Sequence, residues 1–228
     1  MQAMTEFRFG PDESRFGWSL GTGPLVVFVH GYSGRGAQMA VLASHIAEAG
    51  FQAVIFDAGG HGSSRAEPIG FNTFIHATRD IVAHLDGPVH ALIGHSAGGL
   101  GMMRARGLYG VTAEKYVVIS SPFFPYPPLE NMRKKGASEE AIDHLKPVIA
   151  AQFQTDWSTL ANGLCYAPES EKPLLAIFDR ADEMVWHTDA EPLQSIWPNT
   201  SIVMTDGYGH NRILKADETL AAISDFLA

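Results

Sequence analysis

One stretch decides the fold: Ile93-Gly94-His95-Ser96-Ala97-Gly98-Gly99-Leu100. A short apolar run, Val89 to Ile93, precedes it, and residues 97–109 that follow read as a helix. The segment is therefore predicted to be a strand, a sharp turn and a helix with Ser96 at the tip. This is the Gly-x-Ser-x-Gly pattern of a nucleophile elbow. Glycine suits the positions two before and two after the serine, because a strained turn crowds the flanking backbone.

Such a turn has a chemical consequence. It lifts the serine hydroxyl above the sheet edge, and it aims the amide N–H of Ala97 and the positive end of the following helix at a bound molecule. A simpler interpretation is a Gly-rich turn that only lets the helix pack closely on the strand. The pentapeptide alone leaves both interpretations open.

The composition narrows the class of protein. The 228 residues are 46% hydrophobic and 18% charged, which fits one soluble globular domain. The net charge of -9 argues against a nucleic-acid partner or an anionic membrane partner. A single cysteine, Cys165, excludes an intramolecular disulfide framework. Residues 1–11 lack the apolar core of a signal peptide, and no apolar run approaches membrane-spanning length. We therefore expect a cytoplasmic location.

Strand-like and helix-like segments alternate along most of the chain. After an N-terminal hairpin of residues 5–9 and 16–20, strands are expected at residues 25–29, 53–56, 89–93, 116–119, 174–178 and 201–204. Helices are expected around residues 39–49, 71–85, 97–109, 189–197 and 217–227. This alternation predicts a mostly parallel sheet flanked by helices, with any ligand site at the carboxyl ends of the strands.

The alternation breaks after Ser121. The proline-rich residues 122–128 are expected to form neither a helix nor a central strand. Residues 138–153 are amphipathic, with Ser138 as the N-cap, and Pro147 is expected to kink or divide that helix. A further short helix is expected to start around Asp156.

A serine nucleophile needs a base and a group that orients the base. His210 is the candidate base because it follows the last strand in the glycine-containing loop 206–211. Acids follow the preceding strand, and Asp182 is favoured over Asp179, which comes too soon after the strand and is expected to cap the turn or contact Arg180. Glu183 and Asp206 are the other carboxylates near these strand ends. The alternatives are a histidine packed in its loop and a solvated acidic loop.

The loop after the first buried strand contains a candidate oxyanion donor. Gly31 in His30-Gly31-Tyr32 permits an unusual turn that points the Tyr32 N–H toward a substrate. With the Ala97 N–H it would form an oxyanion hole. The alternative is an ordinary strand-to-helix loop.

Together these motifs resemble the α/β-hydrolase superfamily. The resemblance is carried by His30-Gly31, the glycine-rich loop 57–64, residues 94–99, Asp182 with Val185, and Gly209-His210. It implies an α/β-hydrolase fold, a triad of Ser96, Asp182 and His210, and an oxyanion hole of Tyr32 and Ala97. It also implies one domain, with a core of residues 1–122 and 173–228 and a short cap insertion at about residues 123–172.

The resemblance implies a serine hydrolase, and we expect a carboxylesterase that acts on small esters of short or medium chain through an acyl-enzyme, without a cofactor. The histidines show no metal-ligand spacing, so no metal is expected. A thioesterase, a carbon–carbon bond hydrolase and a hydrolase-fold ligand-binding protein remain alternatives. The substrate pocket is expected to be lined by His30, His95, Phe123, Trp157 and Trp186. The physiological substrate and the oligomeric state stay open.

Overall fold

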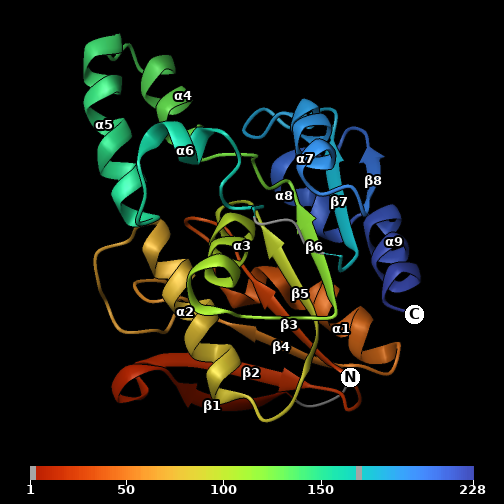
Figure 1. Ribbon diagram of the computed structural model, residues 1–228. Coiled ribbons are helices and arrows are strands. Elements are labelled where there is room, and N and C mark those ends of the chain that lie inside the picture. Colours follow the sequence, from red (N-terminus) through yellow and green to blue (C-terminus); the bar gives the residue numbers. More distant parts are fainter. Residues whose placement is uncertain (1–3, 168–170) are drawn as a thin grey trace.

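The computed structural model describes residues 4–167 and 171–228 (Figure 1). Within this part of the chain one sheet of eight strands has the order β1-β2-β4-β3-β5-β6-β7-β8. The strands are β1 (Thr5–Phe9), β2 (Arg15–Leu20), β3 (Leu25–Val29), β4 (Gln52–Phe56), β5 (Val89–His95), β6 (Lys115–Ile119), β7 (Leu174–Asp179) and β8 (Thr200–Thr205). The strands β1 and β2 form the expected antiparallel hairpin, β2 pairs antiparallel with β4, and all other pairs are parallel.

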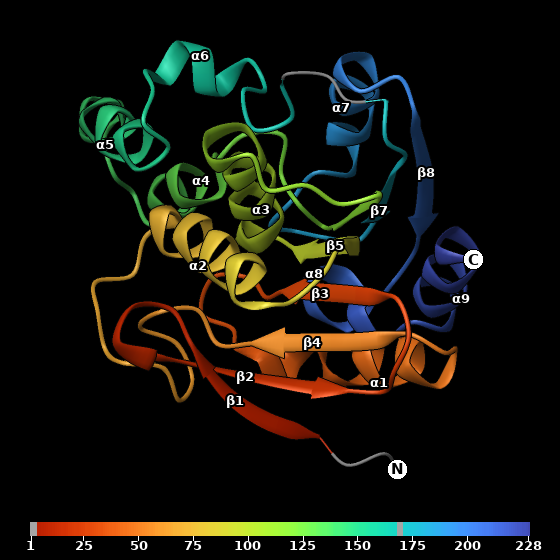
Figure 2. The same cartoon turned by 60° about the horizontal axis from the view of Figure 1, so that its bottom comes forward.

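The central strands are buried on both faces, as their unbroken apolar sequences predict. In β3, Val27 and Val29 contribute to one core, and Val26 and Phe28 contribute to the other. The helices α2 (Phe71–His84) and α3 (Ala97–Tyr109) cover the first face, whereas α1 (Ala40–Glu48) and α9 (Asp217–Leu227) cover the second (Figure 2). The sheet is thus the middle layer of three, which confirms the predicted α/β architecture.

Between β6 and β7 the chain forms three helices: α4 (Pro127–Lys134), α5 (Glu139–Gln152) and α6 (Trp157–Ala161). They gather beyond α2 and α3, at the upper left of Figure 1. Buried hydrogen bonds tie the start of this insertion to the segment after β7. The Tyr126 hydroxyl donates to Asp189 Oδ2 at 2.8 Å and accepts the Trp186 N–H at 2.7 Å. These bonds therefore attach the insertion to the loop that follows β7.

The expectation for residues 122–128 was wrong at its C-terminal end, and Pro147 does not divide its helix. A helix does begin inside the proline-rich segment, because Pro127 and Pro128 occupy the first turn of α4, where no backbone N–H is needed. Helix α5 also runs on past Pro147 as one element. The ring of Pro147 is exposed, so the bond that it removes from the helix lies on the solvent side.

The remaining helices are short. They are α7 (Ala190–Ile196), α8 (Gly209–Arg212) and the 3₁₀ turns at Pro11–Glu13, Gly36–Met39, His187–Asp189 and Ile213–Lys215. Among residues 4–167 and 171–228, no helix has both the length and the apolar character needed to cross a membrane.

Candidate active site

Ser96 lies at the tip of the turn between β5 and α3 in a backbone conformation that few side-chain-bearing residues adopt, with φ 53° and ψ -124°. The flanking glycines are required by close packing. A Cβ at Gly98 would lie 2.2 Å from the carbonyl oxygen of His30, and one at Gly94 would lie 2.5 Å from Cα of Gly99. Strain of this kind is typical of functional sites.

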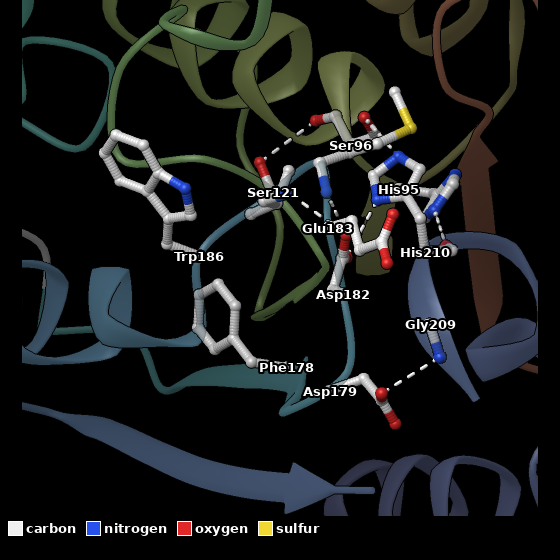
Figure 3. A network of polar contacts seen from close by, with 12 residues as sticks. His95, Ser96, Ser121, Phe178, Asp179, Asp182, Glu183, Trp186, Gly209 and His210 are labelled. Atoms are coloured by element: carbon white, nitrogen blue, oxygen red, sulfur yellow. Dashed lines mark hydrogen bonds and ion pairs between the residues drawn. The ribbon is translucent and has the colours of Figure 1, made fainter. Parts of the chain in front are cut away.

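Three loops bring a serine, a histidine and a carboxylate together (Figure 3). His210 Nε2 lies 3.0 Å from Ser96 Oγ, and His210 Nδ1 lies 2.9 Å from Asp182 Oδ2. An ionised carboxylate only accepts, so the proton of the neutral imidazole is on Nδ1. The bare Nε2 then accepts from the serine hydroxyl. This geometry can move the Ser96 proton to His210.

Asp182 is held in place as an acceptor. Its Oδ1 accepts the N–H groups of Met184 at 2.8 Å and Val185 at 3.0 Å. Burial opposes ionisation of this carboxyl group, but the hydrogen bond and charge of His210 and the two N–H donors outweigh it. The pKa of Asp182 therefore lies below its usual value. The other acids named from the sequence do not reach the imidazole.

Asp179, at the end of β7, caps its own turn through the Ala181 N–H, as expected, and also reaches the loop after β8. Its carboxylate accepts four hydrogen bonds, from the N–H groups of Ala181, Tyr208 and Gly209 and from the hydroxyl of Thr205. Ala181 directly precedes Asp182, and Gly209 directly precedes His210. Asp179 thus joins the loop that carries Asp182 to the loop that carries His210, and Figure 3 shows it reaching Gly209.

His95 contacts the backbone of the loop that carries His210. Its Nε2 lies 2.8 Å from the carbonyl oxygen of His210, so Nε2 carries the proton and donates. Its Nδ1 is buried and has no hydrogen-bond partner in the described part of the chain. Burial, reinforced by the neighbouring His210, lowers the pKa of His95 to about 3, so the ring is neutral near pH 7. His95 was expected to line the pocket, but it is absent from the cavity lining and packs against the His210 ring, with ring centroids 4.8 Å apart.

Two residues beside Ser96 have backbone N–H groups without a hydrogen-bond acceptor in the described part of the chain. They are Tyr32 and Ala97, which line the same cavity as Ser96. His30 fixes the Tyr32 loop: its Nε2 accepts the Ala58 N–H at 3.1 Å, so its Nδ1–H donates to the Gly31 carbonyl at 2.8 Å. Burial lowers the pKa of His30 to about 4. His30 therefore builds the loop and does not line the pocket as expected.

Ser121, two residues after the end of β6, has a supporting position that the sequence did not reveal. Its hydroxyl donates to the carbonyl oxygen of Ser96 at 3.0 Å, and it lies 3.2 Å from the Tyr166 hydroxyl. The contact fixes the strained backbone of the turn from the side opposite the imidazole. A serine directly after a buried strand was the available signal.

A cavity of about 290 Å³ opens beside Ser96. Its lining is mostly apolar and comes from the loop that carries Tyr32, the starts of α2 and α3, and the helices α4 and α5. The residues are Tyr32, Phe71, Ser96, Ala97, Pro122, Pro127, Pro128, Asn131, Leu145, Ile149, Gln152 and Met184. The insertion therefore supplies much of the wall over the serine.

The aromatic residues expected in this pocket lie elsewhere. Phe123 is buried and stacks on Tyr166 with ring centroids 6.1 Å apart. Trp157 packs edge-on against Phe124, and Trp186 stacks on Tyr126. None of the three lines the cavity. The size and apolar character of these side chains favour burial or stacking, but the backbone directs the side chains away from Ser96.

Within residues 4–167 and 171–228, no cluster of histidine, cysteine, aspartate or glutamate side chains has the arrangement of a metal site. The chemistry that these residues offer is that of the serine, the imidazole and the backbone amides.

Comparison with known proteins identifies the family of this chain. The profile of the serine aminopeptidase S33 family matches residues 22–201. The non-heme chloroperoxidase CPO-A1 of Kitasatospora aureofaciens is 28% identical over 145 residues, which cover 63% of this chain and 53% of that protein. The alignment thus spans about half the length of this curated relative.

Two solved structures share the fold. The Pyrococcus furiosus esterase Pf2001 superposes with a TM-score of 0.73 at 19% identity, over 99% of this chain and 92% of that one. The thioesterase domain from the curacin biosynthetic pathway superposes with a TM-score of 0.70 at 17% identity, over 99% of each chain. These likenesses show the fold, and the family match extends over most of the sequence. The chain belongs to the serine aminopeptidase S33 family of the α/β-hydrolase superfamily.

Proposed function

We propose that this protein is a serine hydrolase that cleaves carboxylic esters with a short or medium, uncharged acyl group. One observation carries the proposal: Ser96, His210 and Asp182 are aligned at 3.0 Å and 2.9 Å beside a cavity that also presents the free N–H groups of Tyr32 and Ala97. Nucleophile, base, orienting acid and oxyanion donors are the parts that acyl transfer requires.

The first half-reaction follows from the proton positions. His210 Nε2 takes the hydroxyl proton as Ser96 Oγ bonds to the ester carbonyl carbon. Asp182 stabilises the imidazolium through the bond at Nδ1. The negative charge on the carbonyl oxygen is met by the two amide N–H groups, and losing one such donor typically raises the barrier by about 3 kcal/mol.

The second half-reaction regenerates the enzyme. When the carbon–oxygen bond to the alcohol breaks, the His210 proton passes to the departing alkoxide oxygen, which leaves an acyl group on Ser96. His210 then takes a proton from water, whose oxygen attacks the acyl carbon. Breakage of the bond to Ser96 Oγ releases the acid, and the proton returns to the serine.

The cavity favours an uncharged acyl group. Its lining contains no aspartate, glutamate, lysine, arginine or histidine, so burying a charge there would leave that charge without a partner. A free α-amino group, which the family's aminopeptidase name implies, is largely protonated near pH 7. At roughly 30 Å³ for each water-sized group, a space of about 290 Å³ holds about ten non-hydrogen atoms. A neutral acyl chain of modest length fits these limits better than an amino acid residue.

The test is a panel of matched substrates. We expect steady turnover of butanoate and hexanoate esters, weaker turnover of long-chain esters and no release from aminoacyl arylamides. Ser96→Ala should fold normally and lose nearly all turnover, whereas Ser63→Ala, on an exposed loop, should retain it. Faster turnover of thioesters at equal chain length would establish a thioesterase instead. Cleavage of carbon–carbon bonds, or one turnover without regeneration, would replace the proposal with the corresponding alternative.

A further inference from the structure

The cavity beside Ser96 contains a side-chain amide that the ester reaction does not use. Apart from Ser96, three of its lining residues have polar side chains: Tyr32, Asn131 and Gln152. The Tyr32 hydroxyl already donates to the carbonyl oxygen of Ile69 at 3.2 Å. Asn131 is exposed on α4, whereas Gln152 is partly buried at the end of α5. Gln152 is therefore the least exposed of these three polar residues.

The orientation of the Gln152 amide is fixed by one contact. The N–H of Phe71, the first residue of α2, lies 2.7 Å from Gln152 Oε1. A backbone N–H only donates, so the side-chain oxygen must face α2 and the NH₂ group must face away from it. The position before Phe71 is Gly70, where a Cβ would lie 2.5 Å from that oxygen, so the glycine makes this approach possible.

The NH₂ group has no partner of its own. No described residue accepts a hydrogen bond from Gln152 Nε2, and this nitrogen is not sealed off from solvent. In the unoccupied cavity, water can satisfy it. An alkyl chain long enough to cover it would remove that water and leave a donor unpaired, which is unfavourable. An oxygen acceptor at the same place would avoid this cost.

We propose that Gln152 Nε2–H recognises a neutral carbonyl oxygen on the acyl chain, so that the preferred substrates are esters of oxo acids. A carboxylate acceptor does not fit as well, since the lining carries no cation to balance it. Pockets of this kind take specificity from a few polar groups placed in an apolar wall. This inference rests on the proposed ester hydrolysis and names the class of acyl group.

The wild-type test compares 4-nitrophenyl 5-oxohexanoate with 4-nitrophenyl hexanoate, and 4-oxopentanoate with pentanoate. Each kcat/KM is divided by the rate of hydroxide-catalysed hydrolysis of the same ester, which removes differences in intrinsic reactivity. For the chain that reaches Gln152 we expect the oxo ester to be preferred about 5- to 150-fold, the ratio that corresponds to one unpaired buried donor. No preference at either length would overturn the inference, while turnover of the plain esters would leave the proposed function standing.

The variant test separates the donor from the structural contact. Gln152→Glu keeps an oxygen for the Phe71 N–H and replaces the NH₂ donor by an acceptor. We expect it to abolish the oxo preference, so that the ratio of kcat/KM for the oxo ester to that for the plain ester falls to about 1. Asn131→Asp makes the same chemical change at the exposed rim and should preserve the preference. If Gln152→Glu does not fold, Gln152→Met, which removes the NH₂ donor together with the acceptor for the Phe71 N–H, is measured in its place, and its ratio should also fall to about 1. A preference that survives loss of the Gln152 donor, or that Asn131→Asp also abolishes, would contradict the assignment.

Discussion

Asp179→Asn replaces one acceptor oxygen by an NH₂ donor at the point where the acid loop and the histidine loop meet. In the wild-type protein, Oδ1 accepts the N–H groups of Ala181 and Gly209, both at 2.9 Å. Oδ2 accepts the Thr205 hydroxyl at 2.7 Å and the Tyr208 N–H at 3.2 Å. The substitution keeps the shape of the side chain and changes only its charge and its hydrogen-bonding capacity.

The size of the effect follows from these four contacts. The amide oxygen can keep the two N–H groups at Oδ1, and the NH₂ group can donate to the rotatable Thr205 hydroxyl. The Tyr208 N–H then faces another donor and loses its bond. Bonds to a charged acceptor contribute about 1.5–3 kcal/mol and neutral ones about 0.5–1.5 kcal/mol, so one bond is lost and three weaken. The smaller desolvation cost of an amide offsets part of this loss. We expect the free energy of unfolding to fall by about 3 kcal/mol.

Activity should change through position, not through substrate contact. A shift of the Tyr208–Gly209 backbone moves His210 relative to Ser96 and Asp182, and a displacement of about 1 Å can lower the rate roughly 10²-fold. Asp179 does not line the cavity, so KM for butanoate esters should stay near the wild-type value. The assay measures kcat, KM and urea unfolding, together with the proton resonance of His210 Nδ1–H, which reports its hydrogen bond directly.

A matched control comes from the same loop. Asp206 is exposed, and its carboxylate has no hydrogen bond in the described chain, so Asp206→Asn should leave stability and kcat unchanged. The hydrogen bonds lower the pKa of Asp179 in the folded state despite its burial. Its stabilisation is therefore present above the unfolded pKa near 4 and is lost as pH falls through the folded value. Wild-type stability and kcat in Asp179→Asn at pH 7 would refute the reasoning.

Other expectations concern the acid, the supporting histidines and the cavity wall. Asp182→Asn should lower kcat about 10⁴-fold with little loss of stability, because the imidazole then adopts the wrong tautomer; a kcat within tenfold of wild type would contradict this. His30 and His95 stay neutral in the folded state, with pKa values of about 4 and 3, but bind protons when unfolded below pH 6.5. As pH falls from 7 to 5, each of these histidines should therefore lower the free energy of unfolding by about 2 kcal/mol. His95→Gln, which retains a donor for the His210 carbonyl, should reduce that pH dependence in urea titrations and keep turnover; an unchanged slope would argue against burial of a neutral His95. Leu145→Ala enlarges the cavity and should shift the best ester chain length upward, and an equal fall for all chain lengths would show a purely structural role.

The sequence predicted what depends on local pattern. Unbroken apolar runs such as Leu25–Val29 identified the buried strands, and the Gly-x-Ser-x-Gly pattern identified the turn at Ser96. Chain order then placed Asp182 and His210 after neighbouring strands, where the carboxyl ends of a parallel sheet converge. Their mutual distances are consistent with the triad expected from the resemblance.

The other features depend on where side chains point and on contacts between distant residues, and a linear pattern contains neither. Phe123 and Trp157 were expected in the pocket because they are large and apolar, yet that property is equally satisfied by packing within the insertion. Asp179 was expected to cap its own turn, and it does so through the Ala181 N–H. Its bridge to Gly209 spans 30 residues and becomes visible only when β7 and β8 lie side by side. Gln152 reaches Phe71 across 81 residues in the same way.

The central claim is that Ser96 is the nucleophile, and the most direct measurement is the site of covalent labelling. The protein is treated with a fluorophosphonate, digested, and the modified peptide is sequenced by mass spectrometry. We expect a single adduct on Ser96, loss of esterase activity in proportion to labelling, and no adduct in Ser96→Ala. An adduct on Ser33, Ser63 or Ser121, or esterase turnover that survives complete labelling of Ser96, would contradict the account.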